Sequence, residues 1–159
     1  MLTLSLAAAL AQSPADAPTP TDDPAGLDDV LHALSYRHPK PCDELEGLTP
    51  TPVRTLRHVV ANVQSPPWAP MRAAECLQRN HAEEVREDLL LWVRDPELKG
   101  LGRQAVGLID VLPEALAVDV ARQALQGPVA DRARVVLAAD VRPAVSELVM
   151  AFPETGGTP

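Results

Sequence analysis

Aromatic side chains are scarce in this sequence: Phe, Tyr and Trp make up 3% of the 159 residues, whereas 46% of the residues are hydrophobic. Alanine, leucine and valine supply nearly all of the apolar content. This composition favours close-packed helices over sheets rich in aromatic and β-branched residues. The length suits one domain with a core rather than two large domains. We therefore expect a single all-α domain.

Lysine is nearly absent as well, with two residues in the chain, and the formal net charge is −8. Nucleic-acid binding requires clustered Lys and Arg, so this composition argues against a nucleic-acid partner. Gly-x-Ser-x-Gly, phosphate-loop and Rossmann glycine patterns are also missing, which predicts no catalytic activity and identifies no cofactor. The longest apolar run has about ten residues, whereas a membrane span needs about twenty, so no membrane span is expected.

That apolar run, residues 1–11 (MLTLSLAAALA), predicts a signal peptide, because it ends in the small-x-small pattern of a signal-peptidase site. We therefore expect a periplasmic or secreted protein. No Lys or Arg precedes the run, so either the peptide is atypical or translation starts upstream of Met1. The alternative interpretation is a disordered alanine-rich terminus.

Proline-rich segments flank the predicted domain on both sides. Residues 12–26 (QSPADAPTPTDDPAG) form a predicted disordered linker, because such a composition cannot bury enough apolar surface to offset the entropy lost on ordering. Residues 153–159 (PETGGTP) form a predicted disordered tail of the same character. The folded domain is therefore expected over residues 27–152.

Within the domain, prolines mark the expected ends of helices, because proline is tolerated in the first turn and breaks a helix interior. Pro96, Pro113, Pro128 and Pro143 follow one another at intervals of 17, 15 and 15 residues, and each interval holds one helix of about three turns. Upstream, Pro52 and the cluster of Pro66, Pro67 and Pro70 bracket another segment of helix length. Asn80 is the predicted N-cap of the next helix upstream. Between these positions, apolar residues recur at spacings of three and four. Two such stripes are Val85, Leu89, Trp92 and Val93, and Leu101, Ala105, Leu108, Ile109 and Leu112.

Two neighbouring helices form a unit of about thirty residues, and these units resemble one another. Residues 71–77 (MRAAECL) align with residues 102–108 (GRQAVGL) at an offset of 31, and with residues 131–137 (DRARVVL) at a further 29. An Asp-Pro pair at 95–96 and a Gly-Pro pair at 127–128 follow the second helices. In these features the chain resembles bacterial HEAT repeats of the short type, with their R-x-A-x-x-x-L first helix.

The resemblance implies a short right-handed α-solenoid of helical hairpins, with repeats at about 69–95, 97–127 and 129–151. The apolar pattern from Leu27 to Leu34 predicts an N-terminal capping helix. An irregular helical bundle with accidental spacing is the alternative. Proteins similar to HEAT repeats usually bind other proteins, so the resemblance implies an interaction module or scaffold with an unidentified protein partner.

The two cysteines, Cys42 and Cys76, are the strongest candidates for special chemistry. In an oxidising compartment they are expected to form a disulfide that fastens the N-terminal segment to the first repeat. They are otherwise two free thiols, or they bind a metal together with His38 and His81. The metal hypothesis corresponds to a second function class, a metal-binding accessory protein or an enzyme.

An arginine begins the first helix of each repeat: Arg72, Arg103 and Arg132. Equivalent positions line up in a stack, and a guanidinium can meet a carboxylate of its own or the next unit. Asp110, Asp119 and Asp131 are candidate partners. We expect either a ladder of inter-repeat contacts or a row that binds an anionic group of a partner.

Overall fold

The computed structural model describes residues 23–36 and 40–152, and every regular element in these ranges is helical. The predicted signal peptide, residues 12–22 of the linker, His38 and the predicted tail lie outside these ranges. None of the described helices is long and apolar enough to cross a membrane. The α-helices are α1 (Leu27–Ser35), α2 (Cys42–Glu46), α3 (Pro52–Asn62), α4 (Ala69–Asn80), α5 (Arg86–Arg94), α6 (Lys99–Gly107), α7 (Glu114–Gln126), α8 (Ala130–Leu137) and α9 (Pro143–Ala151), and two short 3₁₀ helices are η1 (Pro96–Leu98) and η2 (Ile109–Val111).

Prolines mark helix starts as predicted. Pro52 and Pro143 are the first residues of α3 and α9, where a missing N–H costs no hydrogen bond. Pro113 directly precedes α7, and Pro96 begins η1. Pro128 lies two residues before α8, whereas α5 begins without a nearby proline. Proline therefore marks the starts of α3, η1, α7 and α9.

The predicted N-cap at Asn80 is wrong. Helix α4 continues through Asn80 as its last residue, and α5 begins six residues later, at Arg86. The Asn80 amide instead donates hydrogen bonds to Asp43 (2.9 Å) and Glu46 (3.0 Å) on α2. The Asn80 side chain therefore binds residues that are distant in sequence, and the residues next to Asn80 do not predict such a contact.

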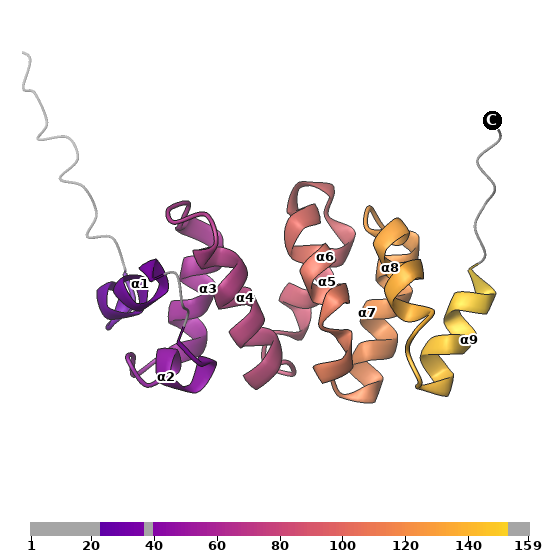
Figure 1. Ribbon diagram of the computed structural model, residues 1–159, viewed down its shortest axis with the longest axis horizontal. Helices are drawn as coiled ribbons and strands as arrows, with labels where there is room; N and C mark the ends of the chain where they lie inside the picture. The colour runs from indigo at the N-terminus through magenta and orange to yellow at the C-terminus, as the bar shows by residue number, and fades with distance from the viewer. Residues whose placement is uncertain (1–22, 37–39, 153–159) are drawn as a thin grey trace, which may run out of the picture.

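The helices stand side by side in two layers along the long axis of the molecule (Figure 1). In one layer α4 contacts α6, and α6 contacts α8. In the other layer α5 contacts α7, and α7 contacts α9. Within each layer, therefore, helices two places apart along the chain contact each other.

A continuous apolar core runs between the layers. The predicted stripe on α5 is buried, and Trp92 is only 5% exposed. The stripe predicted over residues 101–112 does not lie on one continuous helix. Helix α6 ends at Gly107, and the apolar pattern continues on η2. Seven helices each place a fully buried leucine in the core, namely Leu34, Leu45, Leu56, Leu77, Leu89, Leu116 and Leu137.

The N-terminal end of the stack is covered by two short helices, α1 and α2, rather than by the single capping helix expected. Helix α1 packs against α4, and the Trp68 indole at the start of α4 donates a hydrogen bond to the Leu34 carbonyl (2.8 Å). Residues 23–26, assigned above to the linker, already contact the domain: the Thr49 hydroxyl donates to the Ala25 carbonyl (2.7 Å). The described domain therefore begins about four residues earlier than expected.

Helix α6 approaches α5 closely at Gly102. A Cβ at this position would overlap the Trp92 carbonyl oxygen and lie 3.1 Å from a methyl group of Val129. We therefore expect Gly102→Ala to lower the free energy of unfolding by about 1–3 kcal/mol, because packed backbone must move apart. Urea denaturation followed by circular dichroism measures this change.

Gly100→Ala on the same helix is the matched control. A Cβ at Gly100 would meet nothing within 4 Å, and alanine is the better helix former. This control should be neutral or stabilising. Equal effects of the two substitutions would contradict the close approach of α5 and α6 at Gly102.

Candidate interaction surface

Ion pairs join successive helices of the layer that contains α5 and α7. Arg57 on α3 pairs with Asp88 on α5 at 2.6 Å, and also donates a hydrogen bond to the Glu84 carbonyl (2.9 Å). Arg86 on α5 pairs with Asp119 on α7. The paired residues are 31 and 33 positions apart, close to the spacing of about thirty residues predicted from the sequence. These contacts link α3 to α5 and α5 to α7.

Amide side chains make the corresponding contacts in the layer of α4 and α6. Gln78 is 1% exposed, and its amide donates hydrogen bonds to the carbonyls of Ala105 (2.8 Å) and Leu108 (3.1 Å). Gln104 donates in the opposite direction, to the Met71 carbonyl (2.6 Å). Buried polar groups require such partners, so these bonds favour one alignment of α6 against α4.

The three arginines predicted to form a row have different surroundings. Arg103 pairs with Asp131 of the next unit at 2.7 Å, one of the partners anticipated from the sequence. Arg72 instead pairs within its own helix with Glu75 (2.6 Å) and donates to the Lys40 carbonyl (2.8 Å). Among the described residues, the Arg132 side chain makes no ion pair or hydrogen bond, and only its backbone N–H donates, to the Asp131 carboxylate. The described contacts include an inter-unit ion pair only for the middle arginine.

Alanine substitutions should therefore rank the three arginines by stability. Arg72→Ala should cost the most, about 1–3 kcal/mol, because the arginine is largely buried and its loss leaves partners unsatisfied. Arg103→Ala should cost less than about 1 kcal/mol, because its ion pair is exposed. Arg132→Ala should be neutral. Melting temperatures of the three variants test this order, and a loss at Arg132 as large as that at Arg72 would contradict it.

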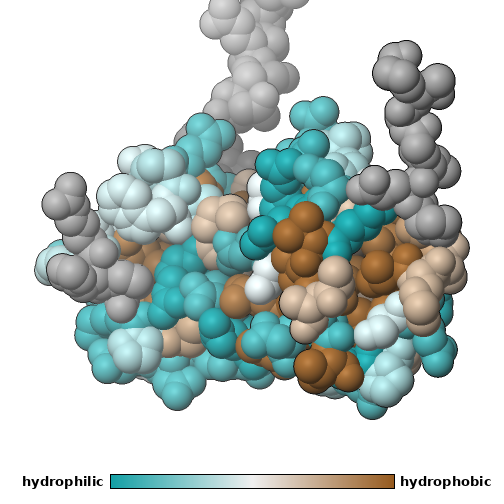
Figure 2. Space-filling model, turned by 45° about the vertical axis from the view of Figure 1, so that its right-hand side comes forward, coloured by the Kyte–Doolittle hydropathy of each residue, from teal (hydrophilic) through white to brown (hydrophobic). Residues whose placement is uncertain are grey.

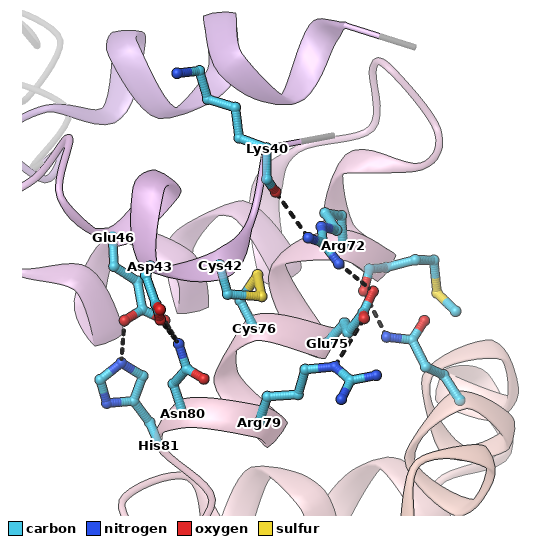
Figure 3. The surroundings of a disulfide bond; sticks show 12 residues. Lys40, Cys42, Asp43, Glu46, Arg72, Glu75, Cys76, Arg79, Asn80 and His81 are labelled. Atoms are coloured by element: carbon cyan, nitrogen blue, oxygen red, sulfur yellow. Dashed lines mark hydrogen bonds and ion pairs between the residues drawn. A yellow bond between two sulfur atoms is a disulfide. The ribbon is translucent and has the colours of Figure 1, made fainter. Parts of the chain in front are cut away.

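A disulfide joins Cys42, at the start of α2, to Cys76 in the middle of α4, as predicted (Figure 3). The two Cα atoms are 5.2 Å apart, and both residues are buried. The bond is flanked by the Asn80 hydrogen bonds to α2 on one side and by the Arg72 contact with Lys40 on the other (Figure 3). Helix α2 is thus fastened to α4 along its whole length.

Glu75 lies between Arg72 and Arg79 on the exposed side of α4, beside the disulfide (Figure 3). Partial burial raises the pKa of its carboxyl, but hydrogen bonds from the two arginines outweigh this effect, and the net pKa is lowered. The carboxylate therefore stays ionised and holds both guanidinium groups along α4.

The metal hypothesis requires Cys42, Cys76, His38 and His81 to meet. Both sulfur atoms are used in the disulfide, and His38 lies outside the described residues. The His81 ring lies 3.1 Å from Glu46 and faces α2. Within residues 23–36 and 40–152, no group of three or more His, Cys, Asp or Glu side chains is arranged to hold a metal ion.

A mainly apolar groove of about 300 Å³ lies between α3, α5 and the start of α6. Leu91 is 37% exposed in this groove, whereas Trp92 lies deeper. The Arg57–Asp88 ion pair forms its polar edge. Its apolar lining consists of Val60, Ala61, Leu91, Trp92, Leu98 and Leu101. A groove of this size and character can accept one or two apolar side chains of a peptide.

Two further hollows lie on either side of His81. One, of about 400 Å³, is lined by the turn after α4 and by Val111 and Pro113, and the other, of about 370 Å³, is lined by the start of α3. Both are wide and shallow, and neither has an apolar lining comparable to that of the groove. The groove between α3, α5 and α6 is therefore the stronger candidate site.

Sequence reasoning missed the groove and the contacts that position it. The signal was present: Arg57 and Asp88, and likewise Arg86 and Asp119, are separated by roughly the repeat length. Opposite charges one repeat apart are the pattern that would have identified inter-unit pairs.

Comparison of the chain with protein-family models, curated proteins and solved structures gives no match.

Proposed function

We propose that this chain is an exported HEAT-like repeat protein that acts as an interaction module or scaffold, without catalytic activity of its own. It binds an apolar segment of another protein in the groove between α3, α5 and α6. The observation that carries the proposal is the exposed apolar groove. The ion pairs and hydrogen bonds described above join helices of the domain to one another, whereas the groove has no partner in the described structure.

A short α-solenoid is supported by the contacts between units. Hydrogen bonds and ion pairs join residues 27 to 33 positions apart in both layers. Stacked repeats contact mainly their nearest neighbours, and such contacts recur once per repeat. An irregular bundle has no reason to repeat its contacts at this interval.

Protein binding is supported by the character of the groove. Leu91 is one of six large hydrophobic residues exposed among those described, and it lies beside further apolar side chains. The Arg57–Asp88 ion pair at the edge can hydrogen-bond to the backbone of a bound segment. Apolar grooves with a polar rim are typical of peptide-binding surfaces.

An oxidising location is supported by the disulfide. Structural disulfides persist in the periplasm and outside the cell, whereas cytosolic thiols are kept reduced. The bond joins two buried cysteines and fastens a helix of the cap, so it has a structural place in the fold. We therefore propose a periplasmic or secreted protein.

Affinity capture from the periplasm of the host, followed by mass spectrometry, tests the proposal. Leu91→Asp places a charge in the groove and should abolish capture of the specific partner. Tyr36→Asp is the matched control, because Tyr36 is 54% exposed at the end of α1, does not line the groove and should not affect capture. Both variants should keep the wild-type melting temperature within a few degrees. Equal capture by wild type and Leu91→Asp would refute the groove as the binding site.

A further inference from the structure

The first described residues lie against the helix that forms one wall of the groove. The Asp23 carboxylate lies 3.5 Å from Nε2 of His58 on α3. The chain directly after Asp23 is fixed to the domain, because the Thr49 hydroxyl donates a hydrogen bond to the Ala25 carbonyl (2.7 Å). The segment that precedes Asp23 is therefore joined to the described domain at α3.

The groove lies one helical turn from this point. His58 and Ala61 are three residues apart on α3, so their side chains are neighbours on the helix surface, with Cβ atoms about 5–6 Å apart. Ala61 lines the groove, and Arg57, next to His58, belongs to its polar edge. About three extended residues are enough to bring the chain from Asp23 to the groove.

Residues 12–22 are long enough to continue through the groove. Eleven residues in the polyproline II conformation span about 34 Å, at about 3.1 Å for each residue. Helix α3 has 11 residues, which corresponds to a length of about 16 Å. The segment between the predicted signal peptide and Asp23 can therefore pass along the whole wall formed by α3.

The composition of residues 12–22 (QSPADAPTPTD) suits this groove. Three prolines and two alanines supply small apolar side chains. Proline-rich segments favour the extended polyproline II conformation, and they bind apolar grooves lined by aromatic side chains. The groove has Trp92 in its lining and Leu91 exposed within it. A segment too poor in large apolar residues to form a core of its own can thus bind a surface that is already formed.

Charge favours the same occupant. Residues 12–22 contain Asp16 and Asp22 and no basic residue, whereas α3 contains two arginines, one histidine and no acidic residue. Asp88 at the edge of the groove is already paired with Arg57. Opposite charges on the segment and on α3 favour their association.

We propose that residues 12–22 bind in the groove of their own chain and compete there with the protein partner, an inference that rests on the proposed function of the groove. The attachment at Asp23 gives the segment a high effective concentration, so weak binding is sufficient to fill the groove. A partner must displace the segment, and its apparent affinity falls in proportion to the fraction of chains with an open groove. The segment therefore regulates access to the binding site.

Photocrosslinking within the purified full chain tests this contact. Benzoylphenylalanine in place of Leu91 should form an intrachain adduct with residues 12–22, which peptide mass spectrometry locates. Apolar surface is also exposed on the C-terminal side, which Figure 2 brings forward. Val135 on α8 is 68% exposed, so the same photoprobe at Val135 is the control for unspecific contact with apolar surface. This control should give no adduct with residues 12–22.

A Gly-Ser segment of the same length in place of residues 12–22 separates recognition from proximity. This replacement keeps the attachment at Asp23 but removes the prolines and the aspartates. The intrachain adduct at position 91 should fall several-fold. In the host, the adduct of position 91 with the protein partner should increase several-fold, because more chains then have an open groove. Melting temperatures show that the variants are folded.

An equal intrachain adduct with the Gly-Ser segment would overturn the inference, because proximity alone would then explain the contact. So would an equal adduct at Val135, an adduct that joins two chains, or a partner adduct at position 91 without any intrachain adduct. The last result would leave the proposed function intact. The proposed function fails separately if position 91 forms the intrachain adduct but gives no partner adduct with either segment.

Discussion

Replacing Trp92 with alanine is expected to lower the free energy of unfolding by about 3–5 kcal/mol. The indole is 5% exposed, and it lies between the apolar core and the groove that it helps to line. Its removal leaves a cavity, because closely packed neighbours relax only in part around a deleted side chain. Urea denaturation of the oxidised protein measures the change.

Trp68→Ala is the matched control, because it makes the same chemical change at a half-exposed position. Trp68 is 47% exposed and makes one hydrogen bond, to Leu34, so its loss should cost about 1 kcal/mol. Equal losses at Trp92 and Trp68 would mean that the α5 stripe is not the centre of the core.

Removing the disulfide through Cys42→Ala together with Cys76→Ala should destabilise the domain by about 4 kcal/mol. The two cysteines are 34 positions apart, so the bond restricts a long loop of the unfolded chain. The helices should still form in the variant, because the bond contributes chiefly through the unfolded state. Urea midpoints by circular dichroism measure the loss.

Reductant provides the control for this prediction. Wild-type protein in reductant should unfold at nearly the same urea concentration as the double variant, and the double variant should not respond to reductant. Denatured wild-type protein without reductant should show no reactive thiol. Two titratable thiols under that condition would contradict the disulfide.

The all-helical fold could be predicted because local signals agree over most of the chain. Pro52, Pro113 and Pro143 locate helix starts, and the α5 stripe around Leu89 and Trp92 identifies a buried face. Both signals depend only on residues within one helix. The Cys42–Cys76 pairing was predictable for a different reason, since two cysteines allow only one intramolecular bond.

Features that depend on contacts between distant segments could not be predicted in the same way. Asn80 has the chemistry of an N-cap, but its amide binds Asp43 and Glu46 on α2 instead. Arg72 has the same repeat position as Arg103. Arg72 nevertheless pairs with Glu75 on its own helix, whereas Arg103 pairs with Asp131 on α8. The groove was missed because Leu91 resembles a core residue in sequence, and its exposure depends on how α3 and α6 are placed.

Photocrosslinking in the host tests the central claim, that the groove between α3, α5 and α6 binds a protein partner, most directly. A photoreactive benzoylphenylalanine in place of Leu91 should form a covalent adduct with one protein of the compartment to which the chain is exported. The same residue in place of Tyr36, which is exposed at the end of α1 and does not line the groove, should not form that adduct. Adducts of the same protein at both positions, or none at position 91 in cells where the chain is folded and oxidised, would contradict the account.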